Sequence, residues 1–522
     1  MEVGSPSNWT RARPLVTWSC SDPDSVRRGF DVRALMLHPR SSEESPTIVG
    51  GLIGVSVILG AAAFGMDRLG FDEWSGILTL TALVAMTIPI LAWLARSEGD
   101  PKLMRLLVWG MVATVVGVLV RFLVVKLVYN DVADSGVYYG GAMELARAMK
   151  QGVFSSVAPS LESRPPETQR VALVLSFVYL ITGTSRWAGS FVFAWLAFGG
   201  RLLMWRALKR AVPEADHKRY LIFLLFFPSL VYWPASMGKE ALMIFSLGVV
   251  SYGVALLLSD KVRAVSIVVF VGGVAGLVLI RPHYGAMAVM ALGVGSLVGT
   301  LHGVGGGAAL KSTLVRVAAL GVLLVVAVVV LSQTARFFGG EGSEGGVSGA
   351  LAKTLDQTTT GGSSFNPSTV TNPTNLPAAI TTVFFRPFIW EADNASTLFA
   401  ALESMMLVVL AVVGWRRLAG GARLMLRRPY LVYVLTFSSG FVVAFSYIGN
   451  FGILARQRTV MLALMLAFLA APPIARGRGL LLKRSARSDD QETEPVMLTV
   501  QQGPSLAERD HPPIRPAPKV NA

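Results

Sequence analysis

The sequence is poor in cysteine, histidine and charge, and each shortage excludes a class of protein. Its single cysteine, Cys20, excludes a disulfide within the chain and a cysteine-rich metal site. The five histidines are scattered and form no HExxH pair, which argues against a zinc centre. Only 15% of the residues are charged, far below the ~25% of an average soluble domain. The composition is therefore not that of an ordinary soluble protein.

Apolar residues are abundant instead. They form 53% of the 522 residues, and the mean hydropathy is +0.56. Apolar runs of roughly 17–23 residues recur along the chain, and ~20 residues are enough to cross a ~30 Å hydrocarbon core. The sequence therefore predicts an all-α, polytopic helical membrane protein. Its thirteen apolar segments lie near residues 47–66, 76–95, 106–128, 171–185, 187–206, 220–237, 240–258, 264–280, 284–301, 315–335, 395–414, 430–449 and 459–473.

Membrane topology explains the formal net charge of +15 better than nucleic-acid binding does. Lys and Arg gather in short loops and in the tails, which the positive-inside rule places in the cytoplasm. The basic loops lie at residues 96–105, 206–219, 260–263, 311–316 and 416–428. Residues 129–170 and 336–394 are then the outer loops. We expect a multi-pass protein of a bacterial plasma membrane, with membrane lipids but no nucleic acid among its partners.

The two ends of the chain differ from its middle. Residues 1–46 and 475–522 are polar and lack apolar periodicity, so we expect disordered cytoplasmic tails around a transmembrane domain at 47–474. If both ends of the chain are cytoplasmic, the chain must cross the membrane an even number of times. Thirteen apolar segments are present, so one of them does not cross. The segment 171–185 is short, and we expect it to be re-entrant or interfacial. The prediction is twelve transmembrane helices plus this one element.

Basic residues at the predicted outer helix ends run against the positive-inside rule, and acidic residues lie beside several of them. Charges near a membrane that are not topological signals usually line a cavity and serve a function. Five chain segments contribute such residues, which suggests one shared pocket for an anion. The residues are Asp131 and Asp134, Lys239 and Glu240, Arg281 and His283, Arg386 and Glu391, and Arg456 and Arg458. The alternatives are helix boundaries, an ion pair that closes a hairpin, and arginines that snorkel to the interface, as Arg121 would.

The apolar pattern of residues 134–152 predicts an amphipathic helix that lies on the outer membrane surface, with Gly152 near its C-cap. Asp134 would begin this helix, where it could cap the Val137 amide. Alternatively, Asp134 or Asp131 could take a proton from an incoming hydroxyl while nearby cations hold a lipid phosphate. The sequence does not separate these two carboxylates.

Several short motifs together resemble the class C glycosyltransferases, polytopic enzymes that use polyprenyl-phosphate sugars. The chain is similar to bacterial integral membrane proteins of surface polysaccharide assembly over roughly residues 105–300, and more weakly from Arg386 to Glu391. The motifs are Asp134-x-x-x-Tyr138 with Gly141 and Ala146, Phe227-Pro228-Ser229 with Trp233, Gly238-Lys239-Glu240-Ala241, and Arg281-Pro282-His283.

The resemblance implies inverting transfer of a hexosyl or pentosyl group from a polyprenyl-phosphate carrier to a cell-envelope glycan or lipid-linked acceptor. It implies that Asp134, or Asp131, is the general base. The implied substrate-binding residues are Tyr138, Lys239, Glu240, Arg281, His283, Arg386, Glu391, Arg456 and Arg458. The first outer loop has no adjacent acidic pair, so a divalent cation is possible but not indicated, and no metal ligand is predicted.

Two other functions remain open at this point. An oligosaccharide repeat-unit polymerase would use the outer arginines to hold two pyrophosphate-linked chains and would not need Asp134. A polysaccharide flippase or transporter should show inverted repeats with paired broken helices, which the sequence lacks. The loop 336–378 is rich in Gly, Thr, Ser and Asn, and is either a lid over the substrate or disordered.

Overall fold

The computed structural model describes residues 70–130, 133–259, 263–301, 363–370 and 372–474, and the single residues 355 and 358. This part of the chain is 80% helix and has no strand, which confirms the all-α class. Two predicted segments, 47–66 and 315–335, lie outside the described residues, as do Asp131 and both predicted tails. The elements are α2 (Phe71–Glu98), α3 (Pro101–Leu127), α4 (Asp134–Lys150), η2 (Pro159–Leu161), α5 (Pro166–Thr182), α6 (Arg186–Ala211), α7 (His217–Phe226), α8 (Pro228–Tyr232), α9 (Lys239–Ser259), α10 (Ala264–Ile280), α11 (Pro282–Leu301), η3 (Pro373–Asn375), α14 (Leu376–Phe385), η4 (Ile389–Glu391), α15 (Ala395–Val413), α16 (Trp415–Leu424), α17 (Pro429–Phe445) and α18 (Phe451–Leu469).

Side-chain caps mark where several helices begin. The Asp100 carboxylate accepts from the Lys102 amide at 2.8 Å at the start of α3. Ser185 accepts from Ala188 at 3.1 Å at the start of α6, and Asn450 accepts from Ile453 at 3.2 Å at the start of α18. Each cap satisfies an amide that has no partner inside its helix. Short polar residues between apolar runs therefore set the helix boundaries.

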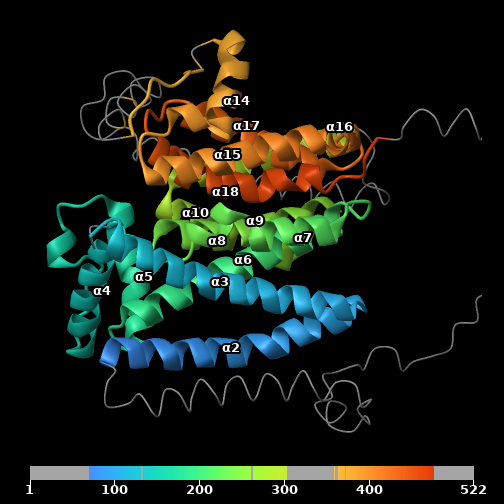
Figure 1. The fold of residues 1–522 in the computed structure, drawn as a ribbon. Helices are drawn as coiled ribbons and strands as arrows, with labels where there is room; N and C mark the ends of the chain where they lie inside the picture. Colours follow the sequence, from blue (N-terminus) through green and yellow to red (C-terminus); the bar gives the residue numbers. More distant parts are fainter. Residues whose placement is uncertain are drawn as a thin grey trace, which may run out of the picture.

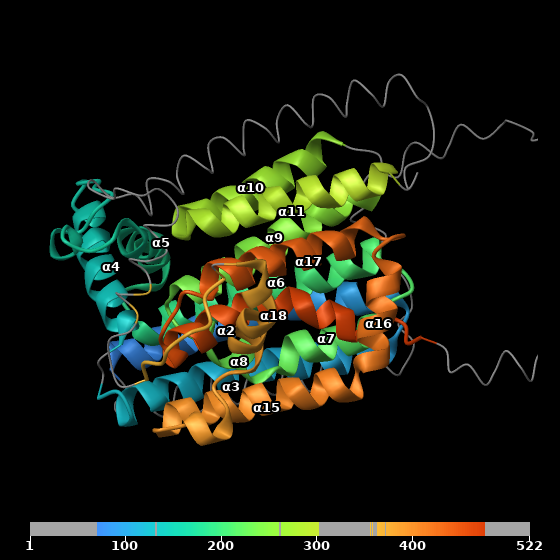
Figure 2. The same ribbon diagram turned by 90° about the horizontal axis from the view of Figure 1, so that it is seen from above.

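The long helices form a bundle in which they run roughly side by side, with α4 crosswise at one end (Figure 1). Seen from above, α9 and α6 lie in the middle, between α10 and α11 on one side and α3 and α15 on the other (Figure 2). The helices α6 and α9 cross closely because both carry glycine there. A Cβ on Gly248 would lie 2.3 Å from the carbonyl oxygen of Gly200. Small residues at such crossings let two helix backbones approach each other in a membrane.

Among the described residues, six helices are long and apolar enough to cross a membrane: α2, α3, α6, α9, α15 and α18. The number rises to seven if α16 and α17, which meet at a bend of 114°, form one span. The predicted segment 220–237 is divided into α7 and α8 at Pro228. Because proline has no N–H, the carbonyl of Leu224 loses its helical partner, and Arg201 donates to it at 3.3 Å instead. The count of twelve crossings remains a prediction.

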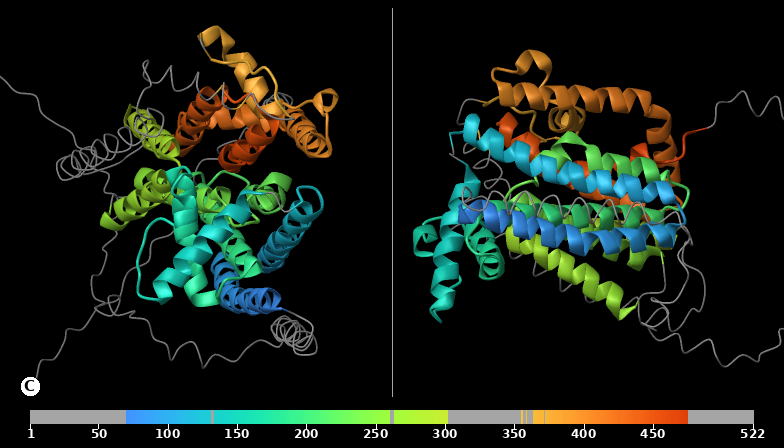
Figure 3. Two further views of the ribbon diagram at one scale, coloured as in Figure 1. Left: turned by 90° about the vertical axis from the view of Figure 1, so that its left-hand side faces the viewer. Right: turned by 60° about the horizontal axis from the view of Figure 1, so that its bottom comes forward.

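The predicted segment 171–185 corresponds to α5, and α5 lies across one end of the bundle beside α4 (Figure 3). At its first turn, Glu167 pairs with Lys239 at the start of α9, and Arg170 donates to the Leu279 carbonyl near the end of α10. At its last turn, the Thr182 carbonyl accepts from Ser75 at the start of α2. Both ends of α5 therefore meet the same end of the bundle, as the predicted interfacial element would.

Three of the basic loops that we predicted to be cytoplasmic, at residues 96–105, 206–219 and 416–428, meet at the opposite end of the bundle. There Lys209 of α6 pairs with Glu98 of α2, and Arg428 pairs with Glu214. Arg417 of α16 lies 3.6 Å from Asp216, just before α7. The predicted inner and outer polar residues are thus separated by the length of the bundle.

Candidate functional site

Arg456 joins two carboxylates from distant parts of the chain at the α4 end of the bundle. Its Nε and Nη2 donate to the two oxygens of Glu240 at 2.6 and 3.0 Å, and its Nη1 donates to Asp134 Oδ2 at 2.7 Å. The Glu240 side chain is 5% exposed, whereas the Asp134 side chain is 61% exposed. The planar guanidinium suits such a two-sided contact, because its donors form a rigid fork. One arginine thus binds a buried acid and an accessible acid at once.

Three separate elements bring these residues together. Asp134 is the first residue of α4, Glu240 lies in the first turn of α9, and Arg456 lies near the start of α18. The residue at the N-cap of α4 is Ala133, whose methyl side chain cannot accept a capping hydrogen bond. The alternative in which Asp134 serves as the helix cap is therefore wrong, and its carboxylate is free to contact Arg456.

A cavity of about 290 Å³ opens beside this cluster. Asp134, Tyr138, Glu240, Arg456 and Arg121 all contribute to its walls. Tyr138 is 2% exposed and lies one turn after Asp134 on α4. The cavity therefore combines two acids, two cations and a phenol, which is the polar content expected of a binding site.

The electrostatic environment fixes the protonation of the two α4 side chains. Burial alone would raise the pKa of Asp134, but the charges of Arg456, Lys239 and Arg121 and the hydrogen bond from Arg456 outweigh it, so this pKa lies below its ordinary value. Burial raises the pKa of Tyr138, and the negative charges of Asp134 and Glu240 raise it further. At neutral pH Asp134 is a carboxylate and Tyr138 keeps its proton.

Arg121 lines the cavity, although from the sequence we expected it to snorkel to the membrane interface. Its Nη1 donates to the Tyr232 hydroxyl at 2.7 Å, and its guanidinium lies 4.8 Å and 4.9 Å from the ring centres of Tyr232 and Trp233. These aromatic contacts hold the cation inside the protein rather than at the lipid interface. The signal was its position six residues before the end of α3, inside an apolar helix.

Lys239, Arg281 and His283 lie around the same cluster. Lys239 pairs with Glu167 at 3.3 Å, with both side chains at most 15% exposed. Arg281 is half-buried, and its charge acts on Glu240, Lys239 and Tyr138. Within the described residues its side chain makes no ion pair. His283 is buried beside the rings of Tyr284 and Phe445.

Arg458 lies on a different face of α18 from Arg456, because residues two apart in a helix point about 200° apart. It is fully buried and donates to the carbonyls of Phe384 and Arg386 at 2.9 and 3.0 Å and to Ser404 at 3.1 Å. Glu403 is 3.5 Å away. Arg458 therefore contacts the end of α14 and does not line the cavity.

Arg386 and Glu391 form a pair of their own. The Arg386 Nε donates to both Glu391 oxygens at 2.9 and 3.1 Å, and Glu391 also accepts from the Phe388 amide at 2.8 Å. The Arg386 guanidinium lies 4.6 Å and 5.3 Å from the ring centres of Phe365 and Phe451. It therefore packs against the first residue of α18, next to cavity residues Asn450 and Gly452.

Part of the loop 336–378 is described and lies against the same turn. The Phe451 amide donates to the Ser363 carbonyl at 3.0 Å, and the Phe365 amide donates to the Gly449 carbonyl at 2.9 Å. Most of this loop, and with it the proposed lid, lies outside the described residues. Residues 363–370 therefore flank the cavity wall at Asn450, and the lid stays a prediction.

The described residues define an all-helical protein with apolar helices suited to a membrane and with a polar cavity at one end of the bundle. Among these residues, no group of three or more His, Cys, Asp or Glu side chains could hold a metal ion. Comparison of the chain with protein-family models, with curated proteins and with solved structures gives no match.

Proposed function

We propose that the protein is a membrane glycosyltransferase that takes a sugar from a polyprenyl-phosphate carrier to a glycan or lipid-linked acceptor at the outer face. The observation that supports it most is the accessible, ionised Asp134 beside a cavity that also contains Arg456 and Arg121. The proposal includes about twelve membrane crossings, a class C-like architecture and a bacterial plasma membrane.

Asp134 is the general base in this proposal. The acceptor hydroxyl attacks the anomeric carbon, the bond from that carbon to the phosphate oxygen breaks, and the hydroxyl proton moves to Asp134. Arg456 occupies one oxygen of Asp134, Oδ2, and so orients the carboxylate with Oδ1 available to the acceptor. A carboxylate with a lowered pKa is a weak base, so its role is to receive a proton that the acceptor releases late in the transition state.

The cations of the site stabilise the departing phosphate. Arg121 lines the cavity and makes no ion pair with a described residue, so its charge is available to an anionic ligand. Arg281 adds positive potential next to Glu240. Cations that are already in position when charge develops on a leaving group lower the barrier without further reorganisation.

The test is sugar transfer in proteoliposomes with a panel of polyprenyl-phosphate sugars. Asp134→Asn should reduce the rate by about 10²–10⁴-fold while expression and membrane insertion stay normal. Glu144→Gln is the matched control, because Glu144 lies on the same helix, away from Arg456, and accepts from the Ser160 amide at 3.2 Å. Asp131→Asn, tested in parallel, separates the two candidate bases. Wild-type rates in Asp134→Asn would remove Asp134 from the mechanism and favour the polymerase.

A further inference from the structure

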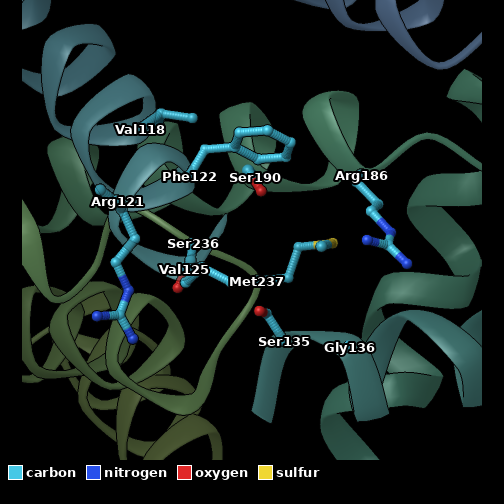
Figure 4. Close-up of a pocket in the computed structure, with 11 residues that line it drawn as sticks. Val118, Arg121, Phe122, Val125, Ser135, Gly136, Arg186, Ser190, Ser236 and Met237 are labelled. Carbon is cyan, nitrogen blue, oxygen red and sulfur yellow. The ribbon is translucent and has the colours of Figure 1, made fainter. Parts of the chain in front are cut away.

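A second pocket adjoins the site cavity and lies between α3, α6 and the first turn of α4. Arg121 and Arg186 stand on opposite sides of it, with Ser135, Ser236 and Met237 between them (Figure 4). Arg121 and the three residues between also line the site cavity. The two spaces are therefore neighbours that share one wall.

The charges around this second pocket are unbalanced. The Arg186 guanidinium lies 4.8 Å from the centre of the Tyr139 ring. Like Arg121, Arg186 makes no ion pair with a described residue. The Nε of Arg121 is buried and has no hydrogen-bond partner among these residues. None of the described side chains that line the pocket is acidic. Arg121 and Arg186 thus line one space whose described walls carry no carboxylate, and this excess of positive charge favours an anion there.

The size of the pocket limits which anion fits. Its volume is about 40 Å³, room for about three water molecules. That space is comparable to one phosphate group and too small for a nucleotide or a free sugar phosphate. Ser135 and Ser236 place two hydroxyls between the arginines, where they can donate to phosphate oxygens.

A narrow apolar groove of about 30 Å³ between α2, α3 and α6 adjoins the pocket. Val118 belongs to the walls of both, and beyond it the groove is lined by Leu80 and Leu83 of α2, Val115 of α3, and Phe191 and Ala194 of α6. Thr87 also lines the groove. Its hydroxyl oxygen already accepts a hydrogen bond from the Trp195 indole N–H at 2.7 Å. Because α2, α3 and α6 are all candidate membrane spans, the groove lies where hydrocarbon chains would reach it.

We propose that the pocket and groove bind one phosphorylated lipid, with its phosphate between Arg121 and Arg186 and its chain along α2, α3 and α6. This inference rests on the proposed function and identifies where the lipid carrier is held. A group attached to that phosphate extends past Arg121 into the cavity of Asp134. Arg121 thus contacts the carrier phosphate, and Arg186 determines its position from the other side.

The experiment measures lipid binding directly, without turnover. Native mass spectrometry of the purified full-length protein in detergent compares decaprenyl phosphate with uncharged decaprenol, and inorganic phosphate serves as a competitor. Decaprenyl phosphate should bind at least about ten-fold more tightly than decaprenol, since a charge-assisted contact is lost in the latter. Inorganic phosphate should compete poorly, because it lacks the chain that fills the groove.

Matched variants separate the two parts of the site. Arg186→Gln should weaken decaprenyl phosphate binding about ten-fold, whereas Arg206→Gln, an arginine near the other end of α6 that stacks over Trp93 at 5.5 Å, should leave it unchanged. Leu83→Trp should fill the groove and weaken both lipids, whereas exposed Ala82→Trp should not. Equal binding in Arg186→Gln and Arg206→Gln, equal binding of the two lipids, or full competition by inorganic phosphate would each overturn the inference.

The outcomes also separate this inference from the proposed function. Specific lipid binding without sugar transfer from any donor would support the groove and contradict the transferase. Sugar transfer with unchanged donor dependence in both Arg186→Gln and Leu83→Trp would overturn the groove and leave the transferase in place.

Discussion

Glu240 and Arg456 lie 216 residues apart, yet Arg456 donates to both oxygens of the Glu240 carboxylate at 2.6 and 3.0 Å. The pair links the start of α9 to α18, and the Glu240 side chain is 5% exposed. A buried carboxylate needs its partner far more than an exposed one does, because water cannot replace the lost hydrogen bonds.

Loss of Arg456 should therefore destabilise the protein strongly. We expect Arg456→Gln to lower the free energy of unfolding by about 3–5 kcal/mol, since it leaves Glu240 charged and unpaired. The control is Arg428→Gln, whose partner Glu214 is 42% exposed and whose loss should cost about 1 kcal/mol or less. Unfolding of the purified variants by denaturant measures both. The double variant Arg456→Gln/Glu240→Gln should recover much of the loss, and equal costs for the two single variants would contradict the prediction.

The contribution of Asp134 to stability should depend on pH only in acid. Its pKa is lowered in the folded protein, so the ionised form stabilises the fold at any pH above its ordinary value of 3.8. This contribution is lost as the pH falls through the lower, folded value. We expect the difference in unfolding midpoint between the wild type and Asp134→Asn to be constant from about pH 8 to pH 5 and to shrink below about pH 4. A difference that changed between pH 5 and 7 would mean that the pKa is raised.

Gly200 should tolerate no larger residue. A Cβ at this position would lie 2.4 Å from the Ile244 carbonyl oxygen and 2.6 Å from the Phe245 Cα, and these backbone atoms cannot rotate away. Gly200→Ala should therefore separate α6 from α9 and cost roughly 1–3 kcal/mol. The neighbouring Gly199 has open space around it, so Gly199→Ala should be neutral or slightly stabilising. Thermal unfolding of the two variants gives the comparison, and similar midpoints would argue against the close crossing.

The predicted topology can be tested with two cysteines. Ser156 is exposed in the loop after α4, and Ala422 is exposed on α16 at the opposite end of the bundle. A cysteine at Ser156 should react with a membrane-impermeant reagent added from outside, and a cysteine at Ala422 should react only after the cells are opened. Ala422 is preferable to Gly421, where a Cβ would lie 2.7 Å from the Phe468 ring. If only the cysteine at Ala422 reacted from outside, the predicted topology would be wrong and the inverted one would hold.

Much of the candidate site followed from where charge occurs in the sequence. Asp134, Glu240 and Arg456 stood out because each lies at a helix end where the positive-inside rule does not explain it, and the structure brings all three together. The choice between Arg456 and Arg458 depended on the rotation of α18, which adjacent sequence does not reveal. Arg121 was missed because its aromatic partners lie more than 100 residues away.

The helix count was harder to predict than the helix class. Apolar runs identify helices well, and the odd number of segments pointed to 171–185, the segment of α5, as the one that lies differently. The division at Pro228 was not predicted. Hydropathy averaged over an apolar run does not register a single proline inside it, so segment counting alone could not detect this break.

Arg201, which donates to the carbonyl that Pro228 frees, has a consequence for how the chain enters the membrane. It lies inside α6, makes no ion pair with a described residue, and donates also to the Thr114 hydroxyl of α3 at 2.7 Å. Of the six candidate spans, α6 is the least hydropathic. An arginine at the centre of a helix opposes insertion by the translocon by about 2.5–3.5 kcal/mol. Because its partners come from α3 and α7, α6 should leave the translocon only together with its neighbours, and α3 and α7 then act as intramolecular chaperones for its insertion.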